Sequence, residues 1–207
     1  MTTIYELIEE ASEVLRTPPA DFDFDNPLED PKEIEKKLIA VMEKFGGLGL
    51  SANQVGLNAR VFVMKTADQG MVAFFNPEFT KVSQETDLMK EGCLSFPDIY
   101  LMIKRSKQVE IKYQDSDGKE HLLMLEGLAS RCVQHEVDHL NGIIFLQRAS
   151  QMKIERALKA RPKEKKKRIN YEQRMEIARQ LQNIQSQSDS NIEQGAVSEP
   201  TKVAQQS

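Results

Sequence analysis

Cysteine and histidine are scarce in this chain: its 207 residues include two cysteines and three histidines. Because Cys93 and Cys132 are so few, we expect no framework of disulfides, and each should be a small buried residue, a metal ligand or a nucleophile. Long apolar runs are absent too, since no stretch approaches the roughly 20 residues that cross a bilayer. The acidic start, Met1 to Glu6, lacks the basic and apolar parts of a secretory signal. These absences predict a cytoplasmic protein with no membrane segment.

Charge is distributed unevenly along the chain, whose net charge is −4. Residues 151–207 contain 12 Lys/Arg and 7 Asp/Glu, so residues 1–150 hold the acidic excess. The densest basic block runs from Arg161 to Arg168. Such a block is typical of a solvated, mobile segment, and it also suits a nucleic-acid contact driven by counterion release. We expect a catalytic domain at residues 1–160 and a tail at 161–207 that is partly helical or disordered.

The order of the expected elements, helix, strands, hairpin and helix, favours an α+β fold. Apolar periodicity predicts helices over residues 4–16, 31–44, 128–141 and from 145 to about 160. Strands are expected at residues 60–65 and 72–75, around a turn at 68–70, and in a hairpin of 108–114 and 121–126. Gly142 stands where a helix C-terminal glycine belongs. Residues after about 185 are rich in Gln and Ser and are not expected to fold alone.

The run Gln134–His139 reads Q-H-E-V-D-H and uses two of the three histidines. Residues four apart on a helix share one face, about 5–6 Å apart at Cβ. His135 and His139 can therefore bind one metal ion, and Glu136 can reach a water on that ion. The same pattern also occurs on solvated helices with no metal, so other segments must support the assignment.

A catalytic site of this kind usually has three protein ligands and an open position. The extension H-E-x-x-H-x-x-G-x-x-H is absent because residue 145 is Phe, and Glu155 falls on a Lys/Arg-rich segment. Cys93, between Gly92 and Pro97 in a constrained loop, is the better candidate for the third ligand. A second glycine-rich segment, residues 47–56, offers close backbone approach and the amide of Gln54. It has no strand and helix around a G-x-G-x-x-G pattern, so a dinucleotide site is not expected.

Together these segments resemble the motifs of peptide deformylases. The family pattern is G-φ-G-φ-A-A-x-Q, then E-G-C-φ-S, then Q-H-E-x-D-H, and the chain has G-L-G-L-S-A-N-Q, E-G-C-L-S and Q-H-E-V-D-H. The single departure is Ser51, where the family usually has alanine, and its hydroxyl needs a partner if it is buried. The resemblance covers roughly residues 15–160. It implies antiparallel sheets packed around a central helix that bears the H-E-x-D-H motif, and the residues after 145 predict a C-terminal helical extension.

The resemblance also implies a function, the hydrolysis of the N-formyl group from the formylmethionine of nascent polypeptides, with release of formate. Cys93, His135 and His139 would hold one divalent metal ion, natively iron(II), with zinc, nickel or cobalt possible in purified protein. Glu136 would be the general acid and base. The Gln54 amide and the Leu94 backbone N–H would stabilise the oxyanion.

Substrate contacts are implied in the same way. The family binds peptide backbone as a strand, near the positions of Gly49 and Gly92 here, and its methionine pocket is lined at the positions of Leu48, Arg131 and Cys132. Glu91 and Arg105 are expected to form a buried pair behind the Cys93 loop. Some members have an arginine in the peptide groove where this chain has Tyr100.

Two alternatives remain open from the sequence. One is a zincin-type metallopeptidase, which would require a third Glu or His ligand. The other is a non-catalytic ribosome- or RNA-binding protein with a structural metal, which would explain the basic block but not Gln54 or Glu136. A structural site is also usually closed by four protein ligands, and three are evident here. The basic segment itself is expected to contact the ribosome.

Overall fold

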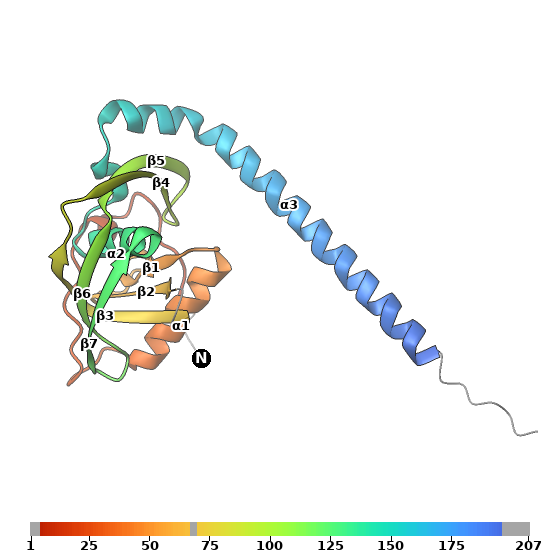
Figure 1. Ribbon diagram of the computed structural model, residues 1–207, viewed down its shortest axis with the longest axis horizontal. Coiled ribbons are helices and arrows are strands. Elements are labelled where there is room, and N and C mark those ends of the chain that lie inside the picture. The colour runs from red at the N-terminus through yellow and green to blue at the C-terminus, as the bar shows by residue number, and fades with distance from the viewer. Residues whose placement is uncertain (1–4, 67–69, 196–207) are drawn as a thin grey trace, which may run out of the picture. The chain divides into compact units, whose positions relative to one another are not determined.

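The structure is a computed structural model that describes residues 5–66 and 70–195, with side chains described up to residue 182. The chain divides into two compact units on either side of the bond between Arg161 and Pro162. The first unit contains both sheets and the helices α1 and α2, and the second contains most of helix α3 (Figure 1). No helix among the described residues is long and apolar enough to cross a membrane.

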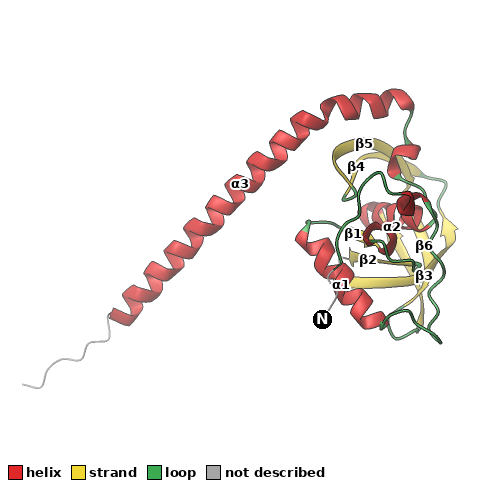
Figure 2. Cartoon of the chain, turned by 180° about the vertical axis from the view of Figure 1, so that it is seen from behind, coloured by secondary structure: helices red, strands yellow, loops and turns green. Residues whose placement is uncertain are grey.

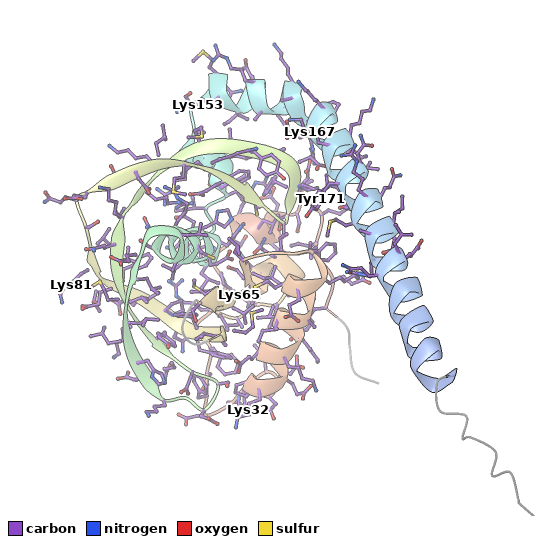
Figure 3. All side chains as sticks on the ribbon, turned by 45° about the vertical axis from the view of Figure 1, so that its right-hand side comes forward. Lys32, Lys65, Lys81, Lys153, Lys167 and Tyr171 are labelled. Atoms are coloured by element: carbon purple, nitrogen blue, oxygen red, sulfur yellow. The ribbon has the colours of Figure 1, made fainter. Side chains whose placement is uncertain are left out.

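The larger sheet is antiparallel throughout and has the strand order β1-β2-β3-β6-β7. Its strands are β1 (Gly49–Ser51), β2 (Val61–Thr66), β3 (Gly70–Val82), β6 (Gln108–Gln114) and β7 (Glu120–Glu126). A separate two-stranded sheet pairs β4 (Thr86–Cys93) with β5 (Phe96–Ser106). Strands are yellow in Figure 2, where the two sheets lie on different sides of α2. Lys32, Lys65 and Lys81 mark the charged surface of this unit (Figure 3).

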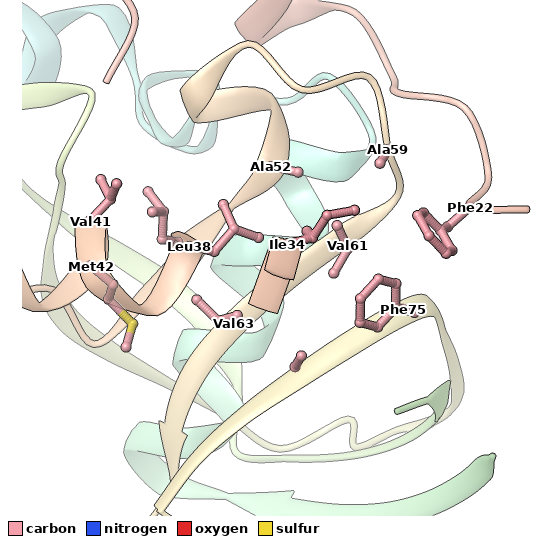
Figure 4. Packing of buried hydrophobic residues seen from close by; sticks show 12 residues of the cluster. Phe22, Ile34, Leu38, Val41, Met42, Ala52, Ala59, Val61, Val63 and Phe75 are labelled. Atoms are coloured by element: carbon pink, nitrogen blue, oxygen red, sulfur yellow. The ribbon is translucent and has the colours of Figure 1, made fainter. Parts of the chain in front are cut away.

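Helix α1 (Pro31–Lys44) begins as the sequence predicts. Asp30 caps it by accepting a hydrogen bond from the backbone N–H of Lys32, and proline at the first helical position has no N–H to satisfy. The apolar stripe of the helix is buried and packs with β2, β3 and Phe22 (Figure 4). Its buried members are Ile34, Leu38, Val41 and Met42. Burial of such side chains stabilises the fold by about 1.5–3 kcal/mol each at most.

Helix α2 (Gly127–Leu140) packs between the two sheets, against β1 and β2 on one side and β5 on the other. Val133, Val137 and Leu140 join the aromatic rings of Phe62 and Phe74 in the core. Asn141 ends the helix, and Gly142 follows with φ of 69°, as its sequence position predicts. The buried position of α2 places the H-E-x-x-H run inside the protein.

The helix predicted at residues 4–16 is wrong. Residues 5–9 have no regular structure, and only a short 3-10 helix, η1 (Glu13–Arg16), forms. The segment is fixed by contacts outside itself: the N–H of Ile8 donates to the carbonyl of Gln54 at 2.9 Å, and Tyr5 donates to Glu29 at 2.6 Å. Its apolar residues also pack into two different clusters, so they do not need to share one helical face.

Helix α3 (Gln151–Gly195) is longer than predicted and includes Pro162. A 3-10 turn, η3 (Phe145–Arg148), precedes it. Proline cannot donate the backbone hydrogen bond of a helix interior, and the boundary between the two units falls at this residue. The helix continues beyond residue 185, where no independent folding was expected. Residues 196–207 and the predicted turn residues Asp68 and Gln69 lie outside the described part of the chain.

Candidate metal and catalytic site

Helix α2 places His135 and His139 one turn apart in the interior. Their rings lie edge to face with centroids 5.0 Å apart, and their exposed fractions are 8% and 1%. The apolar residues Val133, Val137 and Leu140 direct the other face of α2 into the core, which leaves the histidine face toward β4 and β5. Burial keeps the pKa of His139 well below its ordinary value, which favours the neutral imidazole that binds metals.

Cys93 reaches the two histidines from the end of β4. The register between β4 and β5 shifts between Glu91 and Cys93, so the strand bends at this point. The Cys93 Sγ atom lies 3.2 Å from His139 Nε2. One ligand atom from each of Cys93, His135 and His139 lies within 4.8 Å of the others, the one such group among the residues that the structure describes.

A thiolate and two imidazoles are the donor set of a zinc- or iron-type site, and the spacing fits one ion. Bonds from such an ion measure about 2.0–2.3 Å, so two of its ligand atoms lie about 3–4.5 Å apart, and Cys93 Sγ and His139 Nε2 lie 3.2 Å apart. Three protein ligands also leave an open position, as a catalytic site requires. The geometry therefore fits the ligand set predicted from the sequence.

Gln54 is held beside Cys93 by hydrogen bonds with Ser51 and Ser95. It lies in η2 (Ala52–Val55), which ends at Gly56 with φ of 79°. The N–H of Ser51 donates to Gln54 Oε1 at 2.9 Å, so the amide nitrogen points the other way. That nitrogen donates to Ser95 Oγ at 2.9 Å and lies 3.5 Å from Cys93 Sγ. Leu94, directly after Cys93, lies in the turn that the amide faces.

Glu136 lies against β1 and is 4% exposed. Burial raises the pKa of this carboxyl, although the nearby His135 and a hydrogen bond from Ser51 oppose the rise. The Ser51 hydroxyl donates to Oε2 at 2.7 Å. The other oxygen lies toward Gly49, because a Cβ built on that glycine would be 2.6 Å from Oε1. Only a residue without a side chain leaves room for the carboxylate here.

Glu91 supports the site from behind. Arg105 donates to both of its oxygens at 3.0 Å, from Nε and Nη2, as the sequence predicts for this pair. Arg131 donates to Oε1, and His135 Nδ1 lies 3.2 Å from Oε2. Burial alone would raise the pKa of Glu91, but the hydrogen bonds from His135 and Arg105 outweigh it and lower the pKa to about 2. An ionised carboxylate thus orients His135 and leaves its Nε2 atom for an ion.

Comparison with known proteins agrees with this geometry. A family model described as polypeptide deformylase matches residues 4–155. The chain belongs to the polypeptide deformylase family.

Relatives in this family are close in sequence and in fold. The peptide deformylase of Thermotoga petrophila is 45% identical over 63% of this chain and 77% of its own length, and that of Wolbachia pipientis is 41% identical over 69% and 84%. The crystal structure from Thermotoga maritima matches with a TM-score of 0.67 and 39% identity, over 72% of this chain and 99% of that one. A Synechococcus elongatus deformylase in complex with actinonin matches with a TM-score of 0.70 and 30% identity, over 76% and 86%.

Family membership makes the chain a metal-dependent hydrolase that removes the N-formyl group from nascent chains. The other residues that the deformylase motifs predict for the site are placed as follows. Gly49 and Cys132 meet beside Glu136, since a Cβ on Gly49 would be 2.9 Å from Cys132 Sγ. Leu48 is half exposed, and Gly92 lies against the ring of Tyr100. Arg131 is 3% exposed, with its guanidinium bonded to Glu91 and Asp87.

Three contacts were not foreseen from the sequence. The hydrogen bond from Ser51 to Glu136 joins residues 85 positions apart, and that from His135 to Glu91 joins residues 44 apart. Asp138, inside the metal motif, binds Arg105 and is therefore part of the same network. The only signal for these contacts was a serine where the motif usually has alanine, together with a pair of charges that must be compensated if buried.

Proposed function

We propose that Cys93, His135 and His139 bind one divalent ion, iron(II) in the native enzyme, and that the enzyme acts on N-formylmethionyl peptides. The observation that supports this is the convergence of three ligand atoms within 4.8 Å, next to a buried glutamate. A thiolate with two imidazoles also accepts zinc, cobalt or nickel, so purified protein is expected to contain these metals as well. The bound ion supplies Lewis acidity toward the formyl carbonyl and the attacking water.

Glu136 is proposed to move the proton. Its carboxylate takes a proton from the attacking water and passes it to the amine that leaves, so formate and a free α-amine result. Its position supports this role, because it follows one proposed ligand in the sequence and faces Gly49 on the neighbouring strand.

Gln54 and Leu94 are proposed to bind the oxyanion. The Gln54 amide nitrogen lies 3.5 Å from Cys93 Sγ and is fixed by Ser51 and Ser95, so a donor stands ready beside the ligand set. The backbone N–H of Leu94 is on the residue after the ligand. Donors fixed before the reaction stabilise developing charge without reorganisation.

The peptide is proposed to run along β1. This strand is at the edge of the larger sheet, and among the described strands it pairs with β2 alone. A peptide could therefore add as a further strand at Gly49 and face Gly92 across the site. Leu48, Cys132 and the aliphatic part of Arg131 are proposed to line the pocket for the methionine side chain.

The test compares formyl-Met-Ala-Ser with unformylated Met-Ala-Ser. We expect formate from the first and no cleavage of the second, whereas cleavage of internal peptide bonds would favour a metallopeptidase. Glu136→Gln should keep its metal and lose about 10²–10⁴-fold in kcat. Glu43→Gln, the same change at an exposed residue of α1, is the matched control. Near-normal turnover by Glu136→Gln, with metal content measured, would refute the proposed mechanism.

Residues 161–207 are proposed to be a tail that docks the catalytic residues 1–160 on the ribosome. The enzyme is hence proposed to act in the cytoplasm. Residues 151–168 contain nine Lys/Arg and two Asp/Glu. The lysines at 163 and 165–167 are exposed on α3, where Figure 3 labels Lys167. Lysines in such a row attract phosphates, and binding of this kind weakens steeply with salt.

Arg161 joins the start of the tail to the catalytic unit. It bonds to Glu10 and to the carbonyl of Pro97, so a truncation after residue 160 would remove a contact of the catalytic unit. Replacing Lys165, Lys166 and Lys167 by Gln leaves this contact in place. The control replaces the exposed Lys32, Lys65 and Lys81 in the same way.

We expect the tail variant to turn over formyl-Met-Ala-Ser normally and to co-sediment less with ribosomes at low salt. Equal co-sedimentation of both triple variants across a salt series would show that the basic block is a solvated segment with no role in ribosome binding.

A further inference from the structure

Ser51 contacts the residue that is proposed to move the proton in the reaction. It is the last residue of β1, it is fully buried, and it stands where the family motif usually has alanine. A buried hydroxyl without a partner costs free energy, so its partner shows why a serine is tolerated. That partner is Glu136: the Ser51 Oγ atom lies 2.7 Å from Oε2 and 3.1 Å from the backbone carbonyl oxygen of the same residue.

We propose that Ser51 is a positioning residue that holds the Glu136 carboxylate in one orientation through both halves of the proton transfer. The inference rests on the proposed role of Glu136 as acid and base. One carboxylate oxygen is anchored by the hydroxyl, and the other lies toward Gly49. Ser51 also binds Gln54 Oε1 through its N–H, so one residue contacts both the proton carrier and an oxyanion donor.

The hydroxyl can serve both protonation states because it is donor and acceptor at once. When Glu136 is ionised, the Ser51 O–H donates to Oε2. When Oε2 holds the proton, the acid O–H donates to Oγ, and the hydroxyl hydrogen turns to the Glu136 carbonyl oxygen 3.1 Å away. Each state thus keeps its hydrogen bonds, and the carboxyl group need not rotate between them.

Alanine at this position offers neither bond. The Glu136 side chain would then be restrained by packing alone, with a wider range of orientations for the same metal site. The backbone bond from Ser51 to Gln54 would remain, because it does not depend on the side chain. The expected loss is therefore in the rate of proton transfer and not in substrate binding.

The test is Ser51→Ala, assayed with formyl-Met-Ala-Ser. A hydrogen bond to a charged group that is lost in the reacting state corresponds to about 10-fold in kcat, while KM should stay within about twofold. Metal content and the visible spectrum of the cobalt(II) form should not change, since no ligand is touched. Ser51→Thr keeps the hydroxyl and should recover most of kcat if the added methyl group is accommodated.

The matched control is Ser130→Ala. Ser130 is equally buried, lies on α2, and donates to the carbonyl of Ser106 at 3.0 Å. It should lower the unfolding midpoint about as much as Ser51→Ala and leave kcat unchanged, which separates positioning from general destabilisation.

A double variant keeps the inference testable even if Ser51→Thr does not fold. If Ser51 acts through Glu136, then adding Ser51→Ala to Glu136→Gln should cost nothing further. Equal kcat for Ser51→Ala and wild type, or independent losses in the double variant, would overturn the inference. If the Ser51 inference fails in one of these ways while Glu136→Gln alone is inactive, the proposed role of Glu136 still stands. Failure of the Ser51 inference is thus distinguished from failure of the proposed function.

Discussion

Glu91→Gln is the most informative single change in this protein, because it alters one charge and almost no volume. The carboxylate is 7% exposed, and each oxygen has two donors. Oε1 accepts from Arg105 Nε and from Arg131, and Oε2 accepts from Arg105 Nη2 and His135 Nδ1. Whichever oxygen becomes NH₂, two donors lose their acceptor and meet another donor.

Glu91→Gln is expected to lower both the free energy of unfolding and the affinity for metal. Removing one partner from a buried ion pair destabilises a protein by about 3–5 kcal/mol, because the remaining charge is uncompensated. Because the hydrogen bonds from His135 and Arg105 lower the pKa of Glu91 to about 2, its carboxylate is ionised at neutral pH in the wild type. Loss of the acceptor for His135 Nδ1 should also weaken metal binding about 10–100-fold, as is typical for residues that orient a ligand.

The measurement is urea unfolding of the metal-free and metal-loaded protein, followed by competition with a chelator. Glu85→Gln is the matched control, since Glu85 pairs with Lys107 at 3.1 Å with both side chains more than half exposed. An exposed pair of this kind contributes about 0–1 kcal/mol. If Glu91→Gln is no less stable than Glu85→Gln, and loses metal to the chelator no faster, the supporting role assigned to Glu91 is wrong.

Three further changes follow from the same contacts. Cys93→Asp replaces a soft thiolate by a hard carboxylate, and metal analysis after growth with mixed metals should show less zinc relative to iron; an unchanged ratio would count against Cys93 as a ligand. Gly49→Ala should lower kcat strongly at full metal content, because its Cβ would lie 2.6 Å from Glu136 Oε1. The hydrogen bonds from Arg161 lower the pKa of Glu10 below its ordinary 4.5. That contribution, about 0.2–1 kcal/mol, is complete above pH 4.5 and is lost as the pH falls through the lowered pKa of Glu10. The urea midpoint of Glu10→Gln should therefore fall less steeply with decreasing pH than that of the wild type.

The parts of the site that lie close together in sequence were predictable. The spacing of His135 and His139 determines their shared helical face, and Asp30 with Pro31 determines where α1 begins. The hairpin of β6 and β7 was also predicted, from alternation on either side of an Asp-Gly turn. In each case a local preference and the final structure agree.

The parts that depend on distant contacts were not predictable. Residues 4–16 have helical periodicity, but the described part of the segment is irregular apart from η1, because Tyr5 and Ile8 bind groups far along the chain. Strands β1, β4 and β5 were not predicted, although β5 alternates between buried and exposed residues along most of its length. β4 is largely polar and exposed, so its sequence shows little alternation of apolar and polar residues. β1 has three residues and is defined by its pairing with β2.

A network of charged side chains behind the metal ligands was also not predictable from the sequence. Three carboxylates and three guanidinium groups join β4, β5, α2 and η3, so the formal charge of the cluster is zero. Its members are Asp87, Glu91, Asp138, Arg105, Arg131 and Arg148. Each residue alone has the sequence context of a surface charge. Four of the six, Glu91, Arg105, Arg131 and Asp138, are buried, and burial of these charges is tolerable because each is paired with an opposite charge. Asp138, inside the metal motif, joins α2 to Arg105, and Arg105 in turn holds Glu91 against His135.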